Sequence, residues 1–232
     1  MKAYAIVITG NETSEKGYKN LLKSSSDVDN RFFIERFDAI ISDNVDAHME
    51  KEGLKWTWPD SGTTFNQKLN MRFHAYGGPP KRRHACAMSH FYLWKKCVEE
   101  SKPILILEHD AFFTKKLDPG YILDSDYECV GINDPRGATR LANKFHNIVQ
   151  SAPGPLVDCP IIDNMQVPQG IAGASAYIIK PEGADQAIGA AYDYGLWPND
   201  ALLCQQLFPW LGVTKTYYTT VQGLKSTTFT RV

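Results

Sequence analysis

Two uninterrupted apolar runs constrain the fold of this chain more than any other feature of its sequence. AYAIVIT occupies residues 3–9, and ILIL occupies residues 104–107. Continuous runs of β-branched and aliphatic residues of this length are typical of strands that are buried on both faces. Helical patterns stand between the expected strands, and strands that alternate with helices predict an α/β sheet that is at least partly parallel.

The other elements are predicted from local periodicity and from residues that end helices and strands. The clearest helix is expected at residues 84–101, where apolar residues recur at three-to-four spacing before Pro103. Further helices are expected at residues 14–26 with Ser14 as the cap, after a turn at residues 181–183, and at residues 199–208. Further strands are expected at residues 32–41, 127–133, just before that turn, and 214–223. Residues 56–80 lack a clean period and are expected to form a long irregular loop, a kind of segment that is often functional.

Chain length and net charge indicate the number of domains and the kinds of partner to expect. The chain has 232 residues and no linker or repeat, so a single domain over residues 1–232 is expected. Its net charge is −1, which gives no sign of a nucleic-acid or anionic-membrane surface apart from the basic run KRRH at residues 81–84.

Compartment is predicted from what the sequence lacks. No apolar run approaches the roughly 20 residues that span a bilayer. The N-terminal apolar run has no small-residue cleavage site after it and is expected to be the first strand, not a signal peptide. The five cysteines include no C-x-x-C pair. They are expected to be reduced core thiols of a cytoplasmic protein, without a zinc site.

The strongest functional signal is EHD at residues 108–110, directly after the ILIL run. Ligands of open α/β sheets bind beyond the carboxyl ends of the strands. Residues two apart in an extended segment face the same side, so Glu108 and Asp110 can share one ligand. Hard oxygen ligands suit Mg²⁺ or Mn²⁺, which relieves the repulsion between two carboxylates. The alternative is a strand end with solvated charges, because short acidic motifs often occur by chance.

The segment around these residues resembles glycosyltransferase family 25, the family of lipopolysaccharide and lipooligosaccharide sugar transferases and collagen galactosyltransferases. Members carry Gly-Cys-x-x-Ser-His at the start of a helix, then an apolar strand that ends in Glu-Asp-Asp or a similar triplet. Here ACAMSH stands at residues 85–90 and EHD at residues 108–110, so Ala85 replaces the glycine and His109 replaces the middle acid. Weaker similarity runs from near the start to about Leu203. The arginine pair of the first helix is missing.

The resemblance implies a GT-A-type fold with a Rossmann-like mixed sheet flanked by helices. It also implies a UDP-sugar donor, a hexose such as galactose or glucose, and a Mn²⁺ or Mg²⁺ ion held by Glu108 and Asp110. The metal would stabilise charge on the leaving diphosphate. The acceptor would be a glycan or lipooligosaccharide. Transfer is expected to invert the sugar carbon, with Asp200 of LWPNDALL as the base and Trp197 as a stacking surface for sugar.

Further residues are expected at the donor. Arg82 and Arg83 stand just before the predicted helix at residues 84–101, whose N-terminus can attract phosphate. Each of these assignments has a structural alternative: a solvated basic run, a core histidine, a tight glycine turn, or a helix-capping acid at Asp200. For His109, packing inside the protein is slightly favoured over contact with the ligand. The expected donor-binding residues are Ile8, Thr9, Arg82, Arg83, Ser89, His90, Glu108, His109 and Gly173.

Other functions stay open at this point. One is a nucleotide-sugar-binding module that keeps the fold without turnover, which the substitution at His109 favours. Another is a metal-dependent hydrolase or nuclease, although no second acidic or histidine cluster stands near residues 108–110. A hydroxymethylated DNA base is an alternative acceptor, and the near-neutral charge counts mildly against it.

Overall fold

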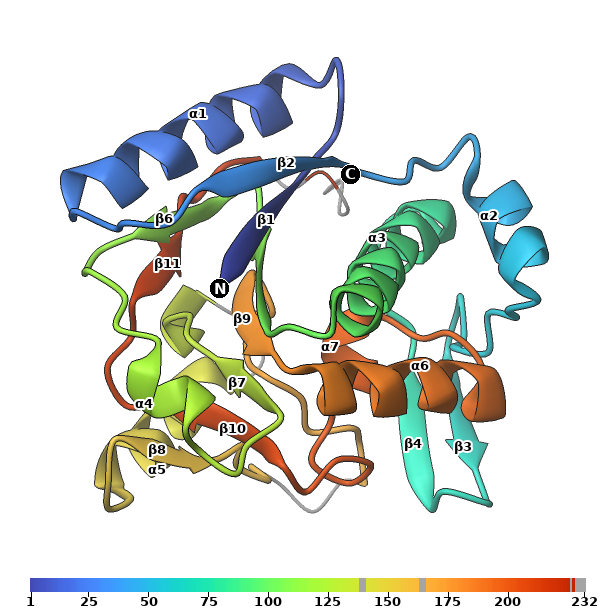
Figure 1. Cartoon of the computed structure of the whole chain (residues 1–232). Helices are drawn as coiled ribbons and strands as arrows, with labels where there is room; N and C mark the ends of the chain where they lie inside the picture. The colour runs from blue at the N-terminus through green and yellow to red at the C-terminus, as the bar shows by residue number, and fades with distance from the viewer. Residues whose placement is uncertain (138–140, 163–165, 226, 228–232) are drawn as a thin grey trace.

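The computed structural model describes residues 1–137, 141–162, 166–225 and 227. Within these residues a seven-stranded mixed sheet runs through the centre, in the order β2-β1-β5-β9-β7-β10-β8 (Figure 1). Strands β2, β1 and β5 are parallel, β9 is antiparallel to both β5 and β7, and β10 pairs parallel with β7 and antiparallel with β8. The strands are β1 Lys2–Val7, β2 Ile34–Asp38, β5 Ile104–Glu108, β7 Cys129–Gly131, β8 Leu156–Asp158, β9 Ala176–Ile179 and β10 Leu211–Thr214. The predicted α/β class with a mixed sheet is confirmed.

Helices cover both faces of the sheet. Strand β1 shows why, because Tyr4 and Ile6 enter one apolar cluster while Ala3, Ala5 and Val7 enter another. The helix α3 packs against α6 on one side, and α1 lies on the other side (Figure 1). The helices are α1 Glu12–Asp27, α2 Val45–Glu52, α3 Pro80–Glu100, α4 Gly120–Leu123, α5 Ala142–Ser151, α6 Pro181–Tyr194 and α7 Asn199–Leu202, with a 3₁₀ turn η1 at Pro135–Gly137.

The helix α3 begins earlier than its apolar pattern predicts. Pro79 is the N-cap and Pro80 is the first helical residue, a position where proline has no hydrogen bond to lose. The basic residues at 81–83 therefore form the first turn of the helix, and the prediction that they precede it is wrong. At the other end Ser101 adopts the left-handed conformation with φ 50° and closes the helix.

Several predicted boundaries are wrong for a shared reason, which is that distant contacts decide them. Residues 56–80 include an antiparallel hairpin of β3 Thr63–Asn66 and β4 Met71–His74. The expected helix at 199–208 ends at Leu202, and the expected strand at 214–223 is divided between β10 and β11 Thr219–Val221, which pairs with β6 Ala111–Phe113. Residues 181–183 form the first turn of α6.

The cap of α1 also differs from the prediction. The side chain of Asn11 accepts a hydrogen bond from Ser14 N at 3.0 Å, so Asn11 is the cap. The Ser14 hydroxyl instead accepts from Ile8 N at 2.9 Å and ties the end of β1 to the helix. Across the described residues, no helix combines the length and the apolar character that a membrane span requires.

Candidate active site

A pocket of about 450 Å³ opens where the parallel strands β1, β2 and β5 end. Ile8 follows β1, residues 39–42 follow β2, and Glu108 with His109 ends β5; all of them line the pocket. Strands β2 and β5 lie on opposite sides of β1, so the strand order reverses here. Open α/β sheets bind ligands at this kind of edge. The predicted position of the acidic triplet at a strand end is confirmed.

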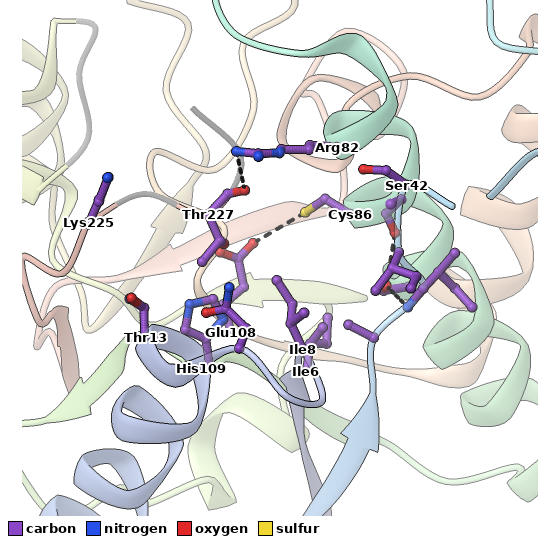
Figure 2. A pocket seen from close by; sticks show the side chains of 16 residues that line it. Ile6, Ile8, Thr13, Ser42, Arg82, Cys86, Glu108, His109, Lys225 and Thr227 are labelled. Carbon is purple, nitrogen blue, oxygen red and sulfur yellow. Dashed lines mark hydrogen bonds between the residues drawn. The ribbon is translucent and has the colours of Figure 1, made fainter. Parts of the chain in front are cut away.

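The first two turns of α3 form the opposite wall. Arg82 and Cys86 reach into the pocket from this helix, and Glu108 faces Cys86 (Figure 2). Arg82 Nη1 donates to the backbone oxygen of Thr227 at 3.5 Å, and Lys225 lies at the same pocket. The pocket therefore combines two cationic side chains with a carboxylate, a charge pattern suited to an anionic ligand that also carries a cation.

Ser89 shapes this wall through hydrogen bonds within the protein. Its hydroxyl donates to the backbone oxygen of Ala85 at 2.9 Å and accepts from Ile40 N at 2.9 Å. The second bond joins α3 to the loop after β2, where an amide would otherwise lose its partner. Direct contact between Ser89 and a donor stays a prediction.

Glu108 is held by three neighbouring residues. Its backbone N–H donates to Ser175 O at 2.8 Å, and its side-chain Oε1 lies 3.3 Å from His90 Nε2 and 3.9 Å from Cys86 Sγ. The side chain remains 29% exposed, so a ligand in the pocket can reach it.

Asp110 carries a buried oxygen without a partner. Its Oδ1 has no hydrogen bond, whereas its backbone oxygen accepts from Gln222 N at 2.9 Å and so fixes the residue. Burial, and after it the nearby charge of Glu108, raise the pKa of Asp110 to about 7. A buried carboxylate oxygen with no donor can be satisfied by a cation or by a proton.

Asp200 comes to the same place from the far end of the chain. It lies in the first turn of the short helix α7, next to Asn199, whose Oδ1 is 3.6 Å from Cys86 Sγ. Burial raises the pKa of Asp200 to about 6, with the charge of Glu108 as the second cause. Burial also raises the pKa of the Cys86 thiol, and the charges of Glu108, Asp200 and Asp110 act in the same direction. The contacts of Cys86 with Glu108 and Asn199 bring α7, and with it Asp200, close to the end of β5.

These residues fit a divalent cation with oxygen ligands. Glu108 is the last residue of β5, Asp110 lies in the turn after it, and the buried Oδ1 of Asp110 has no hydrogen-bond partner among the described residues. A second group of potential ligands is Cys86, His90 and Glu108, whose ligand atoms lie within 4.8 Å of one another. That group has the softer donor set that zinc prefers.

The predicted donor-binding residues divide into two groups. Ile8, Arg82, Ser89, Glu108 and His109 line the pocket, and the buried His90 supports Glu108 from below. The ring of His109 is also packed, since a Cβ on Gly17 would lie 3.2 Å from its Cδ2, and burial lowers the pKa of His109.

Thr9, Arg83 and Gly173 are not among the residues that line the pocket. Thr9 donates to Asp38 at 2.7 Å within an exposed network. Arg83 is buried and donates to the backbone oxygens of the Gly77–Gly78 turn. Gly173 has φ 72° and a Cβ there would lie 2.8 Å from Asn133 Nδ2, so close packing explains the glycine. The expectation that Trp197 offers a sugar-stacking surface is wrong, because this residue is fully buried.

Cys86 and Tyr177 belong to the site but were not among the predicted site residues. Cys86 stands four residues after Arg82 and four before His90, so helical spacing alone could have placed it on the same face. Tyr177 lies on β9 and meets His90 only because β9 pairs with β5. No local pattern indicates that contact.

Comparison with known proteins supports the class. Residues 24–123 match the sequence profile of glycosyltransferase family 25, described as an LPS biosynthesis protein. The match covers less than half of the chain and shows similarity to this glycosyltransferase family over that segment. It also confirms the predicted resemblance to family 25 over a segment that includes Cys86, Glu108 and Asp110, but not Asp200. No curated protein gives a significant match.

Similar solved structures are distant. One is the apo form of the glycosyltransferase GlyE of Streptococcus pneumoniae TIGR4, with 10% identity and a TM-score of 0.39 over 95% of this chain and 44% of that one. Another is a glycosyltransferase involved in glycosylation of the major capsid of PBCV-1, with 7% identity and a TM-score of 0.32 over 82% of this chain and 66% of that one. The chain thus spans less than two thirds of either structure. Likeness at this level supports no inference about activity or substrate.

Proposed function

We propose that this chain transfers a hexose, galactose or glucose, from a UDP-sugar to an acceptor hydroxyl. The observation that carries the proposal is that Glu108 lines a pocket at the ends of parallel strands, with Asp110 two residues further on. Asp200 lies in α7 beside Asn199, which contacts Cys86 of the same pocket. The family match over residues 24–123 supports a nucleotide-sugar donor. Such a site would be of the GT-A type that the sequence resemblance implies.

The donor would lie along the pocket with its diphosphate near the cationic side chains. Arg82 projects from the first turn of α3, where backbone N–H groups and the helix dipole also attract anions. Lys225 adds a second positive charge to the same pocket. Ile40 and Ile41 give an apolar wall against which a nucleobase can pack. A volume of about 450 Å³ lies within the range of small-molecule sites.

Glu108 and Asp110 would hold the Mn²⁺ or Mg²⁺ ion. Bound there, the cation supplies positive charge to the departing diphosphate. For Asp110 it also supplies the partner that its buried Oδ1 lacks. His90 and Cys86 hold Glu108 from the side away from solvent and so orient its free oxygen toward the pocket.

Asp200 would act on the acceptor. As the acceptor oxygen forms its bond to the sugar carbon, the bond from that carbon to UDP breaks and the electron pair leaves with UDP. The proton of the acceptor hydroxyl passes to a carboxylate oxygen of Asp200. A pKa near 6 suits this role, because such a carboxylate is mostly ionised at neutral pH yet basic enough to take a proton. Attack from the face opposite UDP inverts the sugar carbon.

Calorimetric titration of UDP-galactose and UDP-glucose, with and without Mn²⁺, tests this function. We expect one donor to bind in the presence of metal and to lose that binding in Asp110→Ala. Lys116→Ala, which changes an exposed side chain paired with Asp29, is the matched control. Absence of binding by either donor under both conditions would contradict the proposal.

Two alternatives are distinguished by assays of UDP release and of sugar transfer to an acceptor. A binding module without turnover would bind the donor but release no UDP, with or without acceptor. The acceptor favoured here is a glycan or lipooligosaccharide, in line with the family description. A hydroxymethylated DNA base is less favoured because the net charge is −1. Offering both acceptors with labelled donor separates them.

A further inference from the structure

A chain of hydrogen bonds runs through the core and ends on Glu108. Trp94 Nε1 donates to the Tyr177 hydroxyl at 2.9 Å, and that hydroxyl lies 2.7 Å from His90 Nδ1. His90 Nε2 in turn lies 3.3 Å from Glu108 Oε1. The side chains of Trp94, Tyr177 and His90 are all fully buried, so water does not compete for these contacts.

The partners determine where the hydrogens lie. An indole N–H can only donate, so the Tyr177 oxygen accepts from Trp94. The single hydroxyl hydrogen of Tyr177 is buried, and among the described residues His90 Nδ1 is the acceptor within reach. Nδ1 therefore accepts, and the ring hydrogen of His90 resides on Nε2. It points to Glu108 Oε1, which as a carboxylate oxygen accepts it.

This arrangement conflicts with the other use that the same residues offer. Cys86 Sγ, His90 Nε2 and a Glu108 oxygen lie within 4.8 Å of one another, which is a set suited to Zn²⁺ or Co²⁺. As a ligand, Nε2 must carry no hydrogen. The ring hydrogen would then move to Nδ1, and the buried hydroxyl hydrogen of Tyr177 would lose its acceptor. Histidines that bind metals usually donate their second N–H, whereas here the second nitrogen accepts.

We propose that Tyr177 determines which metals this site accepts. By donating to His90 Nδ1 it keeps hydrogen on Nε2, which makes His90 a donor that positions Glu108 and closes the Cys86–His90–Glu108 group to soft metals. Glu108 is thereby left for the oxygen-ligand site with Asp110. The identity of that hard cation rests on the proposed function, but the hydrogen-bond chain and the exclusion of soft metals do not.

Replacing Tyr177 by phenylalanine keeps the ring and removes the hydroxyl. His90 Nδ1 then loses its donor, so the ring is free to carry its hydrogen on Nδ1 and to offer Nε2. We expect Tyr177→Phe to bind Co²⁺ and Zn²⁺ about 10- to 100-fold more tightly than wild type, which is the usual scale of such supporting contacts. Cys86 would bind as thiolate and release its proton to solvent.

Two measurements on the metal-free protein and its cobalt complex test this. Long-range ¹H–¹⁵N NMR of the imidazoles reports which nitrogen of His90 carries hydrogen, with the His90 signals identified by their loss in His90→Gln. Cobalt titration followed by the thiolate-to-cobalt absorption band reports binding at Cys86. We expect hydrogen on Nε2 and no thiolate band in wild type, and a clear band in Tyr177→Phe that Cys86→Ser removes.

The control is Tyr4→Phe, which removes the hydroxyl of an equally buried tyrosine whose partner is Glu100 at the other end of α3. It should leave cobalt binding unchanged. Hydrogen on Nδ1 in wild type, or equal thiolate bands in wild type and Tyr177→Phe, would overturn the proposal. If Tyr177→Phe fails to fold, the wild-type NMR spectrum alone decides. Because neither measurement uses a sugar donor, failure of the proposed transferase function gives a different result.

Discussion

Gly170 lies directly against Asp200, so that a Cβ added at Gly170 would stand 1.8 Å from the backbone oxygen of Asp200. The same Cβ would stand 2.9 Å from the backbone oxygen of Leu203. Backbone atoms cannot move aside as a flexible side chain can. The position of the short helix α7, and with it the carboxylate proposed as base, therefore depends on the absence of a side chain at residue 170.

Gly170→Ala should displace α7 and destabilise the protein. We expect a loss of roughly 1–3 kcal/mol in the free energy of unfolding, the usual scale of overpacking. Denaturant unfolding measures it, and transfer activity should fall at the same time. Gly189→Ala in α6 is the matched control, because a Cβ there meets nothing within 4 Å and alanine favours a helix. Equal effects of the two substitutions would contradict the packing argument.

Asp200→Asn should remove the proton acceptor while donor binding stays intact. We expect kcat to fall by about 10²- to 10⁴-fold, the typical contribution of a general base, with little change in the calorimetric affinity for the donor. Steady-state kinetics together with donor titration separate the two quantities. Unchanged kcat would exclude Asp200 as the base. An equal loss of donor affinity would assign it to donor binding instead.

Asp110 should make the metal-free protein less stable as pH rises. Its folded pKa of about 7 lies above the ordinary value of 3.8, so the folded state holds the proton over a range in which the unfolded state has released it. The free energy of unfolding should therefore fall as pH rises from about 4 to about 7. Asp110→Asn should flatten this fall and be more stable than wild type at pH 8 by on the order of 4 kcal/mol.

The measurement is urea unfolding at several pH values in the presence of a chelator. Asp126→Asn, which removes one exposed carboxylate, controls for the change in net charge. Addition of Mn²⁺ at pH 8 should raise the stability of wild type and not of Asp110→Asn. A stability profile of Asp110→Asn that follows wild type through the whole range would show that Asp110 is not the titrating group.

Arg82→Gln should weaken binding of a diphosphate. The side chain lines the pocket on α3, and charge-assisted hydrogen bonds contribute roughly 1.5–3 kcal/mol. We expect UDP binding to weaken accordingly and uridine binding to change little, as measured by calorimetry. Arg31→Gln, an exposed arginine in the segment between α1 and β2, is the control. Equal loss of affinity for uridine and UDP would place Arg82 away from the phosphates.

The local sequence pattern predicted the helices and strands whose own residues show a clear apolar run or period. The runs at residues 3–9 and 104–107 became β1 and β5, and the spacing at residues 84–101 became most of α3. In each case the burial of side chains on two faces of a strand or one side of a helix leaves a signal within the segment itself. The placement of Glu108 at the end of a buried strand could be predicted for the same reason.

The short elements could not be predicted, because their stability comes from partners elsewhere in the chain. The hairpin β3–β4 packs Phe73 against Trp58 and Trp197, and β11 exists as a strand because β6 pairs with it. Helix α7 is four residues long and is too short to be stable alone, so its apolar pattern over residues 199–208 misled the prediction of its end.

The sequence by itself determined the α/β class, the buried central strands and the pair of acids two residues apart. Only the tertiary structure decided which groups surround those acids. Cys86 of α3 contacts Glu108, and Tyr177 of β9 reaches it through His90. Asp200 of α7 comes near through Asn199, which contacts Cys86, and no local signal spans these separations along the chain. The ionisation of the acids and the hydrogen position on His90 follow from burial and from these neighbours, and both exist only once the chain has folded.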